Sequence, residues 1–386
     1  MTKKVEAPMS ALQVVRKELK TLYFERDAVI DGLLSALLCG QHVLLLGPPG
    51  SAKSALVQHL VGLIDGAEYF YWLLTKFSTP EEIFGPISLA GLQTDKVKRI
   101  TTGKLPEAHL SFLDEIFKAN SAILNSLLTA VNERKFHNDG KAMPIPLVTM
   151  IGASNELPEG EDLEALFDRF LLRYWVSYVD DPSNMRQIMT MTTPHNTPKI
   201  DLRMLRDYQS DARNVSMPDS MIDTLLVIKQ RTEEQGFRSS DRRWRQIVQL
   251  LKAYAYLEGD TEVNEDTLEI LPDALWREPK DRPQLASIVG TVGNPLNVRA
   301  AEILDAAKDV VADVGELRNT NDATAKSEWM RKASLADTSL TQMSQELSDL
   351  MTKNPKRNLR KIKDTASKID ELKKTIAKKV SEAYGI

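Results

Sequence analysis

The chain has 386 residues, of which 42% are hydrophobic and 27% are charged, and its formal net charge is -4. This length allows two or three domains, and the composition is that of an ordinary globular protein. The small negative charge argues against a dedicated nucleic-acid binder, because such proteins are usually basic. The single cysteine excludes an internal disulfide, and no apolar run is long enough to span a bilayer. The first residues carry charge with no apolar region behind them, so we expect no signal peptide and a cytoplasmic protein.

The first half of the chain alternates short apolar runs with segments of helical periodicity. Strands are predicted at residues 42–46, 69–74, 111–113, 146–154 and 171–179. Helices are predicted at residues 26–38, 52–63 and 122–131. Short apolar strands separated by helices are typical of an α/β fold with a parallel sheet and helices on both faces.

Two segments interrupt this alternation. Residues 78–107 contain Gly85-Pro86, Gly91 and Gly103, and they are too long for a plain connection. Residues 136–144 contain Asn138-Asp139-Gly140, a strong signal for a hairpin turn. We expect both segments to be insertions on one face of the sheet.

The second half of the chain is predicted to be mostly helical. Residues 180–218 are irregular and rich in proline, so we expect a linker with short helices. Helices at 219–232, 244–257 and 266–275 would form a small domain. Beyond residue 278, apolar residues recur at alternating four- and three-residue steps over 303–317, 329–350 and 362–380, which indicates an antiparallel bundle or a coiled coil. The basic residues of the last helix favour a solvated face, with a docking surface for an acidic partner as the alternative.

The segment Gly47-Pro-Pro-Gly-Ser-Ala-Lys-Ser54 joins a predicted strand to a predicted helix. In that position, successive backbone N–H groups and the positive end of the helix stabilise a polyphosphate. Lys53 would reach the outer phosphates, and the Ser54 hydroxyl would ligate Mg²⁺. The predicted ATP-binding residues of this loop are Gly47, Pro48, Pro49, Gly50, Ser51, Ala52, Lys53 and Ser54.

Ala52 departs from the usual pattern, which has glycine before the lysine. Because this position begins the helix, we expect the methyl group to be tolerated. Taken alone, the loop could instead be a chance Gly/Pro turn.

Two further strands end in polar side chains. The run Leu110-Ser-Phe-Leu-Asp-Glu115 ends in two carboxylates. Beside a phosphate loop, Asp114 can hold Mg²⁺ through its water shell and Glu115 can take a proton from the attacking water. The run Ile151-Gly-Ala-Ser-Asn155 ends in an amide that could hydrogen-bond that water or the γ-phosphate. The alternatives are an ordinary acidic strand end and an ordinary turn asparagine, and the upstream loop disfavours them.

In this order and spacing, the three elements resemble the Walker A, Walker B and sensor 1 motifs of an AAA+ ATPase. Other segments resemble the MoxR branch of that class, and within it the RavA-like subgroup. The resemblance covers roughly residues 15–290, and the segments that carry it are Phe77-Ser-Thr-Pro-Glu-Glu-Ile-Phe-Gly-Pro86, Gly103-Lys-Leu-Pro-Glu-Ala108, Phe112-Leu-Asp-Glu-Ile116, Asn132-Glu-Arg134, Ala153-Ser-Asn-Glu-Leu-Pro158, Leu166-Phe-Asp-Arg-Phe170, Ser239-Ser-Asp-Arg-Arg-Trp244 and Leu275-Trp276.

The resemblance implies a hexameric ring with ATP at each subunit interface. Arg169 matches the arginine finger, which stabilises charge on the transferring phosphoryl group of the neighbouring site. Arg242 matches sensor 2, although the adjacent Arg243 could exchange roles with it. From charge pattern alone, these arginines would instead be assigned to surface salt bridges. The implied domains are an AAA+ αβα core with pore-facing insertions at residues 1–190, a linker and all-α lid at 191–277, and a helical domain at 278–386.

For function, the resemblance implies a chaperone-like, Mg²⁺-dependent ATPase that remodels or activates a protein complex. Such proteins commonly act with a partner carrying a von Willebrand factor A (vWA) domain. The RavA-like C-terminal region carries a compact β-rich insertion, and no segment of this chain has that composition.

Two alternatives stay open. The first is a nucleic-acid motor or loader, which would need a more basic pore than Lys135, His137 and Lys141 provide. The second is an assembly module that binds ATP with little hydrolysis, which the pair Asp114 and Glu115 argues against.

Overall fold

A computed structural model describes residues 10–93, 95–191, 199–315, 323–354 and 359–384 of the chain. These residues belong to two compact units. The first unit comprises Met1–Ile222, Thr232–Val263 and Ile270–Leu285, and the second comprises Asp223–Arg231, Asn264–Glu269 and Ala286–Ile386.

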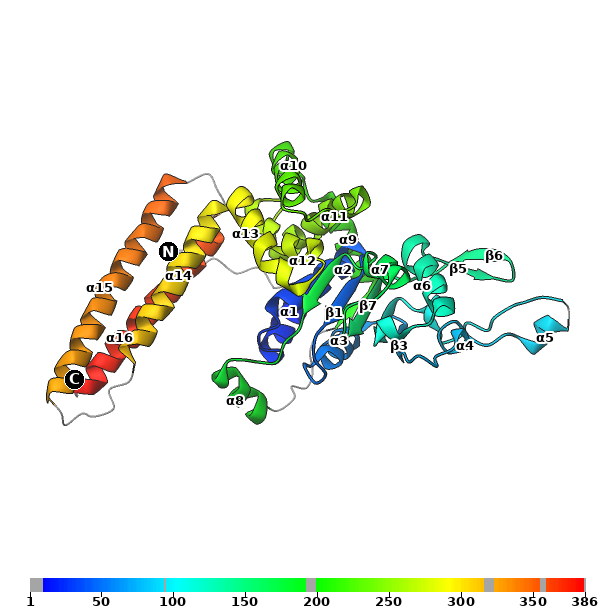
Figure 1. Ribbon diagram of the computed structural model, residues 1–386, viewed down its shortest axis with the longest axis horizontal. Coiled ribbons are helices and arrows are strands. Elements are labelled where there is room, and N and C mark those ends of the chain that lie inside the picture. Colours follow the sequence, from blue (N-terminus) through cyan, green and yellow to red (C-terminus); the bar gives the residue numbers. More distant parts are fainter. Residues whose placement is uncertain (1–9, 94, 192–198, 316–322, 355–358, 385–386) are drawn as a thin grey trace. The chain divides into compact units, whose positions relative to one another are not determined.

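A five-stranded sheet with the order β3-β4-β7-β1-β8 is the centre of the first unit (Figure 1). Each neighbouring pair of strands is parallel. All side chains of β1 and β7 are buried, and because successive side chains point to opposite faces, both faces of the sheet are covered. The predicted α/β fold is therefore confirmed. The strands are β1 (Val43–Leu46), β3 (Tyr69–Leu73), β4 (Leu110–Asp114), β7 (Thr149–Ser154) and β8 (Leu172–Trp175).

Helix α2 shows how the core is built. Its residues 29–38 are all buried, because it lies between the strands β1 and β8 on one side and the helices α9 and α11 on the other. An apolar surface around the whole circumference suits such a position. Apart from two short helices in an insertion, the helices described in the first half of the chain are α1 (Ala11–Leu22), α2 (Asp27–Cys39), α3 (Lys53–Gly62), α6 (Ser121–Glu133), α7 (Glu161–Phe167) and α8 (Pro182–Thr190). A small separate sheet pairs β2 (Ile64–Asp65) with β9 (Ile200–Asp201).

The two predicted insertions project from the same end of this unit (Figure 1). The strands β5 (Lys135–Asn138) and β6 (Lys141–Pro144) form the predicted antiparallel hairpin. Asp139 and Gly140 both have positive φ, as a two-residue hairpin turn requires. The longer insertion contains α4 (Pro80–Phe84), α5 (Leu89–Leu92) and the 3₁₀ turn η1 (Leu105–Glu107). Phe84 stacks on Phe136 with ring centroids 5.4 Å apart, so the two insertions pack together.

The segment predicted as a linker is more regular than expected. It contains α9 (Leu202–Asn214), a 13-residue helix that packs on α2 and α11, whereas residues 192–198 lie outside the described part. The helix predicted over 266–275 is divided into the 3₁₀ turn η3 (Glu265–Ile270) and α12 (Leu271–Leu275). Pro272 lies in the first turn of α12, where its missing N–H costs least. The other elements are α10 (Asp219–Glu234), α11 (Asp241–Glu258), the 3₁₀ turns η2 (Ile116–Lys118) and η4 (Pro279–Asp281), and α13 (Arg282–Gly293).

Three long helices follow, as the periodicity predicted. They are α14 (Pro295–Val314), α15 (Ala323–Lys353) and α16 (Arg360–Tyr384), and each packs on the other two (Figure 1). The buried core of this bundle takes Ile303, Leu340 and Ile369 from the three predicted apolar stripes, whereas Leu317 lies outside the described residues. Among the described helices, none has a stretch both long and apolar enough to cross a bilayer.

Candidate active site

The loop 47–54 leaves the carboxyl end of β1 and enters α3. The amide of Gly47 donates to the carbonyl of Ser154 on β7, which fixes the start of the loop beside that strand. Gly47 has φ +139°, and a Cβ there would lie 2.3 Å from the carbonyl oxygen of Val176. Only glycine fits this position, because the backbones of two segments approach too closely for a side chain.

Ala52 caps the N-terminus of α3 in the left-handed conformation, with φ +66°. The methyl group is therefore accommodated at the start of the helix, as expected, but only at the cost of a left-handed backbone. A left-handed alanine costs roughly 1–2 kcal/mol relative to the right-handed form. Glycine avoids this cost, which explains why the usual pattern has glycine there.

Lys53 lies inside the loop and is 7% exposed. Its ammonium group donates to the carbonyl oxygens of Gly47 and Pro48 at 2.6 and 2.8 Å, and the Asn155 Oδ1 lies 3.4 Å away. Burial lowers the pKa of Lys53, while the nearby carboxylates of Asp114 and Glu115 oppose that shift. The loop thus holds a partly desolvated cation, which favours an anionic ligand such as a polyphosphate.

Asp114, at the carboxyl end of β4, connects the loop to the neighbouring strand. Its Oδ2 accepts a hydrogen bond from the Ser54 hydroxyl at 3.2 Å, and its Oδ1 accepts one from the amide of Glu115 at 3.0 Å. A hydroxyl beside a carboxylate is a donor set that suits Mg²⁺, which keeps several waters and takes further ligands from phosphates. No group of three His, Cys, Asp or Glu side chains that could hold a metal occurs in the described part of the chain. The residues therefore fit a nucleotide-bound Mg²⁺ better than an ion held by the protein alone.

Glu115 and Asn155 form the third part of the site. The Asn155 amide donates to Glu115 Oε1 at 2.6 Å, and the Lys118 ammonium lies 3.3 Å from the other carboxylate oxygen. Glu115 has φ +54°, a left-handed conformation that is strained for a residue with a side chain. Sequence reasoning missed Lys118, because only the 3₁₀ turn after β4 brings it back to Glu115.

The structure places Arg169 and Arg242 elsewhere. Both line a cavity of 520 Å³ together with Gln41 and His42, which precede β1, and with Arg134. The loop 47–54 follows β1, so the cavity lies at the amino edge of the sheet and the loop at its carboxyl edge. Four strand residues separate the two edges by about 13 Å. Neither arginine lies beside the loop 47–54 of its own chain.

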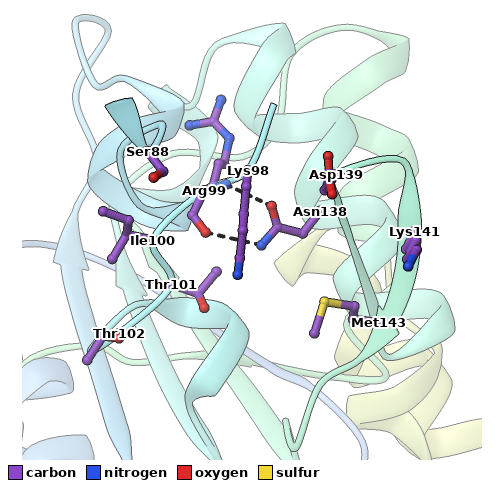
Figure 2. A pocket seen from close by; sticks show the side chains of 10 residues that line it. All are labelled: Ser88, Lys98, Arg99, Ile100, Thr101, Thr102, Asn138, Asp139, Lys141 and Met143. Carbon is purple, nitrogen blue, oxygen red and sulfur yellow. Dashed lines mark hydrogen bonds between the residues drawn. The ribbon is translucent and has the colours of Figure 1, made fainter. Parts of the chain in front are cut away.

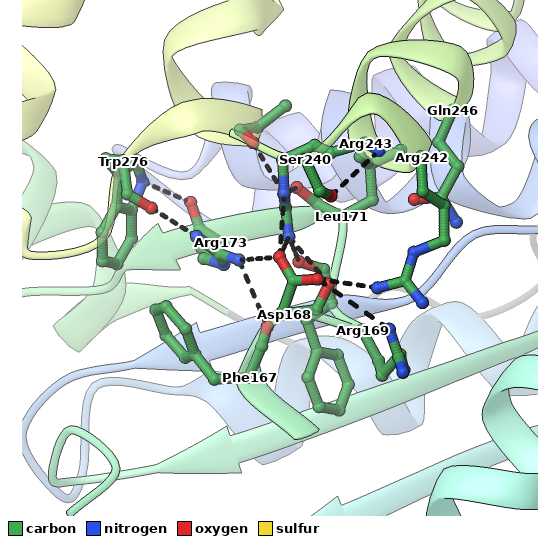
Figure 3. Close-up of polar contacts among 12 residues, drawn as sticks. Phe167, Asp168, Arg169, Leu171, Arg173, Ser240, Arg242, Arg243, Gln246 and Trp276 are labelled. Atoms are coloured by element: carbon green, nitrogen blue, oxygen red, sulfur yellow. Dashed lines mark hydrogen bonds and ion pairs between the residues drawn. The ribbon is translucent and has the colours of Figure 1, made fainter. Parts of the chain in front are cut away.

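Asp168 organises this second cluster, as Figure 3 shows. Its carboxylate receives a hydrogen bond of 2.6 Å from Arg242 and lies 3.9 Å from a guanidinium nitrogen of Arg169. It also lies within 4.0 Å of the buried guanidinium groups of Arg173 and Arg243. Sequence reasoning gave Asp168 no role, although its place directly before Arg169 in the chain was a signal.

Arg242 and Arg243 differ in burial. The side chain of Arg243 is 4% exposed, and it donates to the carbonyl oxygens of Asp168, Phe170, Leu171 and Ala274. The side chain of Arg242 is 41% exposed. Arg243 is therefore committed to holding α11 against the segment before β8, whereas Arg242 is accessible to a ligand.

The comparisons with known proteins decide the family. A family model described as the MoxR domain in the MoxR-vWA-beta-propeller ternary systems matches residues 10–204. This chain belongs to the MoxR family of AAA ATPases. A second model, an AAA lid domain, matches residues 220–289 of this MoxR-family chain. Nucleotide binding follows from membership of the family.

The chain is also similar to individual proteins, one of which carries the MoxR name. A protein of Methanocaldococcus jannaschii, named only as uncharacterized, is 37% identical over 313 residues, which cover 80% of this chain and 83% of that protein. The chaperone MoxR1 of Mycobacterium tuberculosis is 26% identical over 279 residues, covering 67% of this chain and 72% of the chaperone. The crystal structure of a candidate ATPase from Cytophaga hutchinsonii has a TM-score of 0.58 at 19% identity, covering 73% of this chain and 93% of that one, and it shows a shared fold alone.

Proposed function

We propose that this MoxR-family chain hydrolyses Mg²⁺-bound ATP in a ring in which each active site is shared by two subunits. One observation carries the proposal. Hydrogen bonds join five polar residues at the carboxyl edge of the sheet, namely Lys53, Ser54, Asp114, Glu115 and Asn155. In contrast, Arg169 and Arg242 lie at the amino edge. A chain with this arrangement needs a second copy to bring the arginines to the phosphates.

Each residue at the carboxyl edge has a proposed role. The backbone of the loop 47–54 and the Lys53 ammonium group bind the phosphates, as in a Walker A motif. Ser54 and Asp114 hold Mg²⁺, which neutralises charge on the phosphates. Glu115 takes the proton of the attacking water, and the Asn155 amide orients the Glu115 carboxylate. Glu115 would thus be the catalytic residue of the Walker B motif, and Asn155 would be sensor 1.

The arginine cluster is proposed to act on the neighbouring subunit. Arg169 would be the arginine finger and Arg242 the sensor 2 residue, and both would stabilise negative charge that develops on the transferred phosphoryl group. Because both lie in one cavity at the amino edge, one interface would deliver them together. We propose a hexameric ring, because the segments quoted between residues 77 and 170 resemble those of the RavA-like subgroup.

The physiological task is proposed to be the remodelling or activation of a protein complex, together with a partner that carries a vWA domain. Two comparisons support this. The matching family model is described by its MoxR-vWA-beta-propeller ternary systems, and one relative is named as a chaperone. The same proposal keeps the three domains at residues 1–190, 191–277 and 278–386, and it assigns the protein to the cytoplasm.

The test is the rate of ATP hydrolysis per subunit as the protein concentration rises through ring assembly, with Glu115→Gln as the blank. A shared site predicts that the rate per subunit climbs with assembly. Rings of Arg169→Ala subunits alone should be inactive. Rings mixed from Arg169→Ala and Glu115→Gln subunits should regain some activity, because a site is intact wherever Glu115 of an Arg169→Ala subunit meets Arg169 of a Glu115→Gln neighbour. A rate independent of assembly would contradict the shared site. No hydrolysis above the blank would favour an ATP-binding assembly module instead.

A further inference from the structure

A cavity of 530 Å³ lies between the two insertions of the first unit (Figure 2). One wall is the returning segment of the longer insertion, residues 98–102. The other wall is the hairpin β5–β6, which contributes Asn138, Asp139, Lys141 and Met143. Nothing in the proposed ATPase mechanism uses this cavity, which we name the inter-insertion cavity.

Asn138 fixes the distance between the two walls. Its side-chain oxygen accepts a hydrogen bond from the Arg99 amide at 2.7 Å, and its nitrogen donates to the Arg99 carbonyl at 3.1 Å. Asn138 is only 7% exposed. The Arg99 guanidinium group is in turn bound to Glu81 at 3.0 Å and to the Gly85 carbonyl at 2.8 Å. The cavity is therefore preformed, and a ligand would not have to order its walls.

The apolar side chains that line the cavity are exposed to solvent. Phe136, Asn138, Lys141 and Met143 share one face of the hairpin, because cross-strand partners point to the same side. The longer insertion covers the first two of these residues, whereas Met143 remains 51% exposed. Ile100 on the opposite wall is also 51% exposed. Further along the same insertion, Leu89 and Val97 are 78% and 61% exposed. Ile100 and Met143 thus give each wall of the cavity an apolar surface that a ligand can cover.

The charges of the cavity favour an acidic ligand. Lys98 and Lys141 are exposed, and across the described part of the chain neither has a carboxylate within 4.0 Å. Asp139 is the one carboxylate in the lining, and the Arg99 charge is already balanced by Glu81. Two uncommitted cations thus face a single carboxylate, in a chain whose net charge is -4.

We infer that the inter-insertion cavity binds an extended polypeptide segment in which acidic and apolar side chains alternate or adjoin. Its acidic side chains would pair with Lys98 and Lys141, and its apolar side chains would contact Ile100 and Met143. A single-stranded nucleic acid would also meet the two lysines, but none of the lining residues is aromatic and could stack on a base. The inference rests on the proposed function in one respect, since it gives the substrate class of that ATPase.

The test is fluorescence anisotropy with the full chain and ATP. The probes are a fluorescein-labelled peptide of Glu, Leu and Ser, the same peptide with Lys in place of Glu, and an oligothymidylate of equal length. We expect only the acidic peptide to bind well. The double variant Lys98→Glu/Lys141→Glu should bind it on the order of tenfold more weakly, and Met143→Ser should also weaken it. The control Lys374→Glu removes an exposed lysine of the C-terminal bundle and should bind as the unaltered chain does.

The outcomes separate this inference from the ATPase proposal, because basal hydrolysis is measured on the same variants. Neither Lys98, Lys141 nor Met143 belongs to the ATP site, so basal hydrolysis should be unchanged in all of them. Binding of the acidic peptide that is equal in the double variant and the control would overturn the inference, as would preferential binding of oligothymidylate. A third outcome is that the double variant loses peptide binding as expected, but the unaltered chain hydrolyses no ATP. This outcome would uphold the inference and reject the ATPase proposal.

Discussion

The side-chain amide of Asn155 donates a hydrogen bond of 2.6 Å to Glu115, and so joins the ends of two adjacent strands, β7 and β4. The second carboxylate oxygen of Glu115 lies 3.3 Å from Lys118. The proposed general base is therefore held from both sides. Its position depends on the ends of β4 and β7 and on the 3₁₀ turn η2. We therefore expect substitutions that change the orientation of the base to lower activity, as substitution of the base itself does.

The first prediction concerns this hydrogen bond. Asn155→Asp keeps the shape of the side chain but removes the N–H donor, and it places a second carboxylate beside Glu115. We expect kcat for ATP hydrolysis to fall on the order of 100-fold in both Asn155→Asp and Asn155→Ala, because the base loses its orientation. Steady-state kinetics and ATP binding to each variant check this. Full activity in Asn155→Asp would show that the amide donor is not required.

The second prediction separates Arg242 from Arg243. Arg243→Ala leaves several buried carbonyl groups without their donor and removes one of the guanidinium groups around Asp168, so the free energy of unfolding should fall by about 3–5 kcal/mol. Arg242→Ala removes a half-exposed side chain with its ion pair to Asp168, and should change stability by less than about 1 kcal/mol. Urea unfolding followed by tryptophan fluorescence measures both. We expect Arg242→Ala to lose ATP turnover while it stays folded, and the reverse pattern would exchange the roles of the two residues.

The third prediction concerns the backbone of the loop 47–54. Ala52→Gly relieves a left-handed alanine, and after the larger backbone entropy of unfolded glycine is subtracted, stability should rise by about 0.5–1 kcal/mol. Gly47→Ala is the matched control in the same loop, and it should destabilise the protein because its Cβ would meet the Val176 carbonyl. Thermal unfolding of the two variants checks the signs. A lower Tm for Ala52→Gly would mean that the alanine methyl group makes contacts that outweigh the strain.

The fourth prediction is a dependence of stability on pH that arises from His42. This residue is 3% exposed, its Nδ1 accepts a hydrogen bond from the Met150 amide at 2.9 Å, and its Nε2 lies 3.3 Å from the Val131 carbonyl. Burial, with a smaller contribution from the charge of Arg134, holds the pKa of His42 well below its ordinary value. In the folded protein the His42 imidazole therefore stays neutral over a pH range in which the same imidazole of the unfolded chain takes up a proton.

In that pH range the unfolded state binds more protons than the folded state. The contribution of neutral His42 to the free energy of unfolding is therefore fully present above pH 6.5 and decreases as the pH falls below that value. The slope from this one group reaches at most about 1.4 kcal/mol per pH unit. His42→Asn keeps an acceptor near the Nδ1 position and has no titratable ring. Urea unfolding between pH 7 and pH 5 should show a shallower decline for the variant. Parallel curves for the two proteins would assign the acid sensitivity to other groups.

Much of the fold follows from local patterns in the sequence. The run from Val43 to Leu46 is apolar throughout, which predicted a strand buried on both faces, and Asn138-Asp139-Gly140 predicted the hairpin because its turn needs residues that accept positive φ. The three C-terminal helices follow from a repeat of apolar residues that buries one stripe of each helix. Helix α9 was missed because its apolar residues are few, and its position against α2 and α11 depends on contacts far apart in the chain.

The sequence by itself determined where the loop 47–54 and the pair Asp114 and Glu115 lie, because both follow strand ends at short range. Only the tertiary structure decided that Arg169 and Arg242 share a cavity at the opposite edge of the sheet, with Asp168 between them. It also decided that Arg243 is a buried structural residue and that Asn138 joins the two insertions. The contacts of Asn138 with Arg99 and of Arg243 with Asp168 join residues 39 and 75 positions apart, and they arise from packing and from the need of buried polar groups for partners.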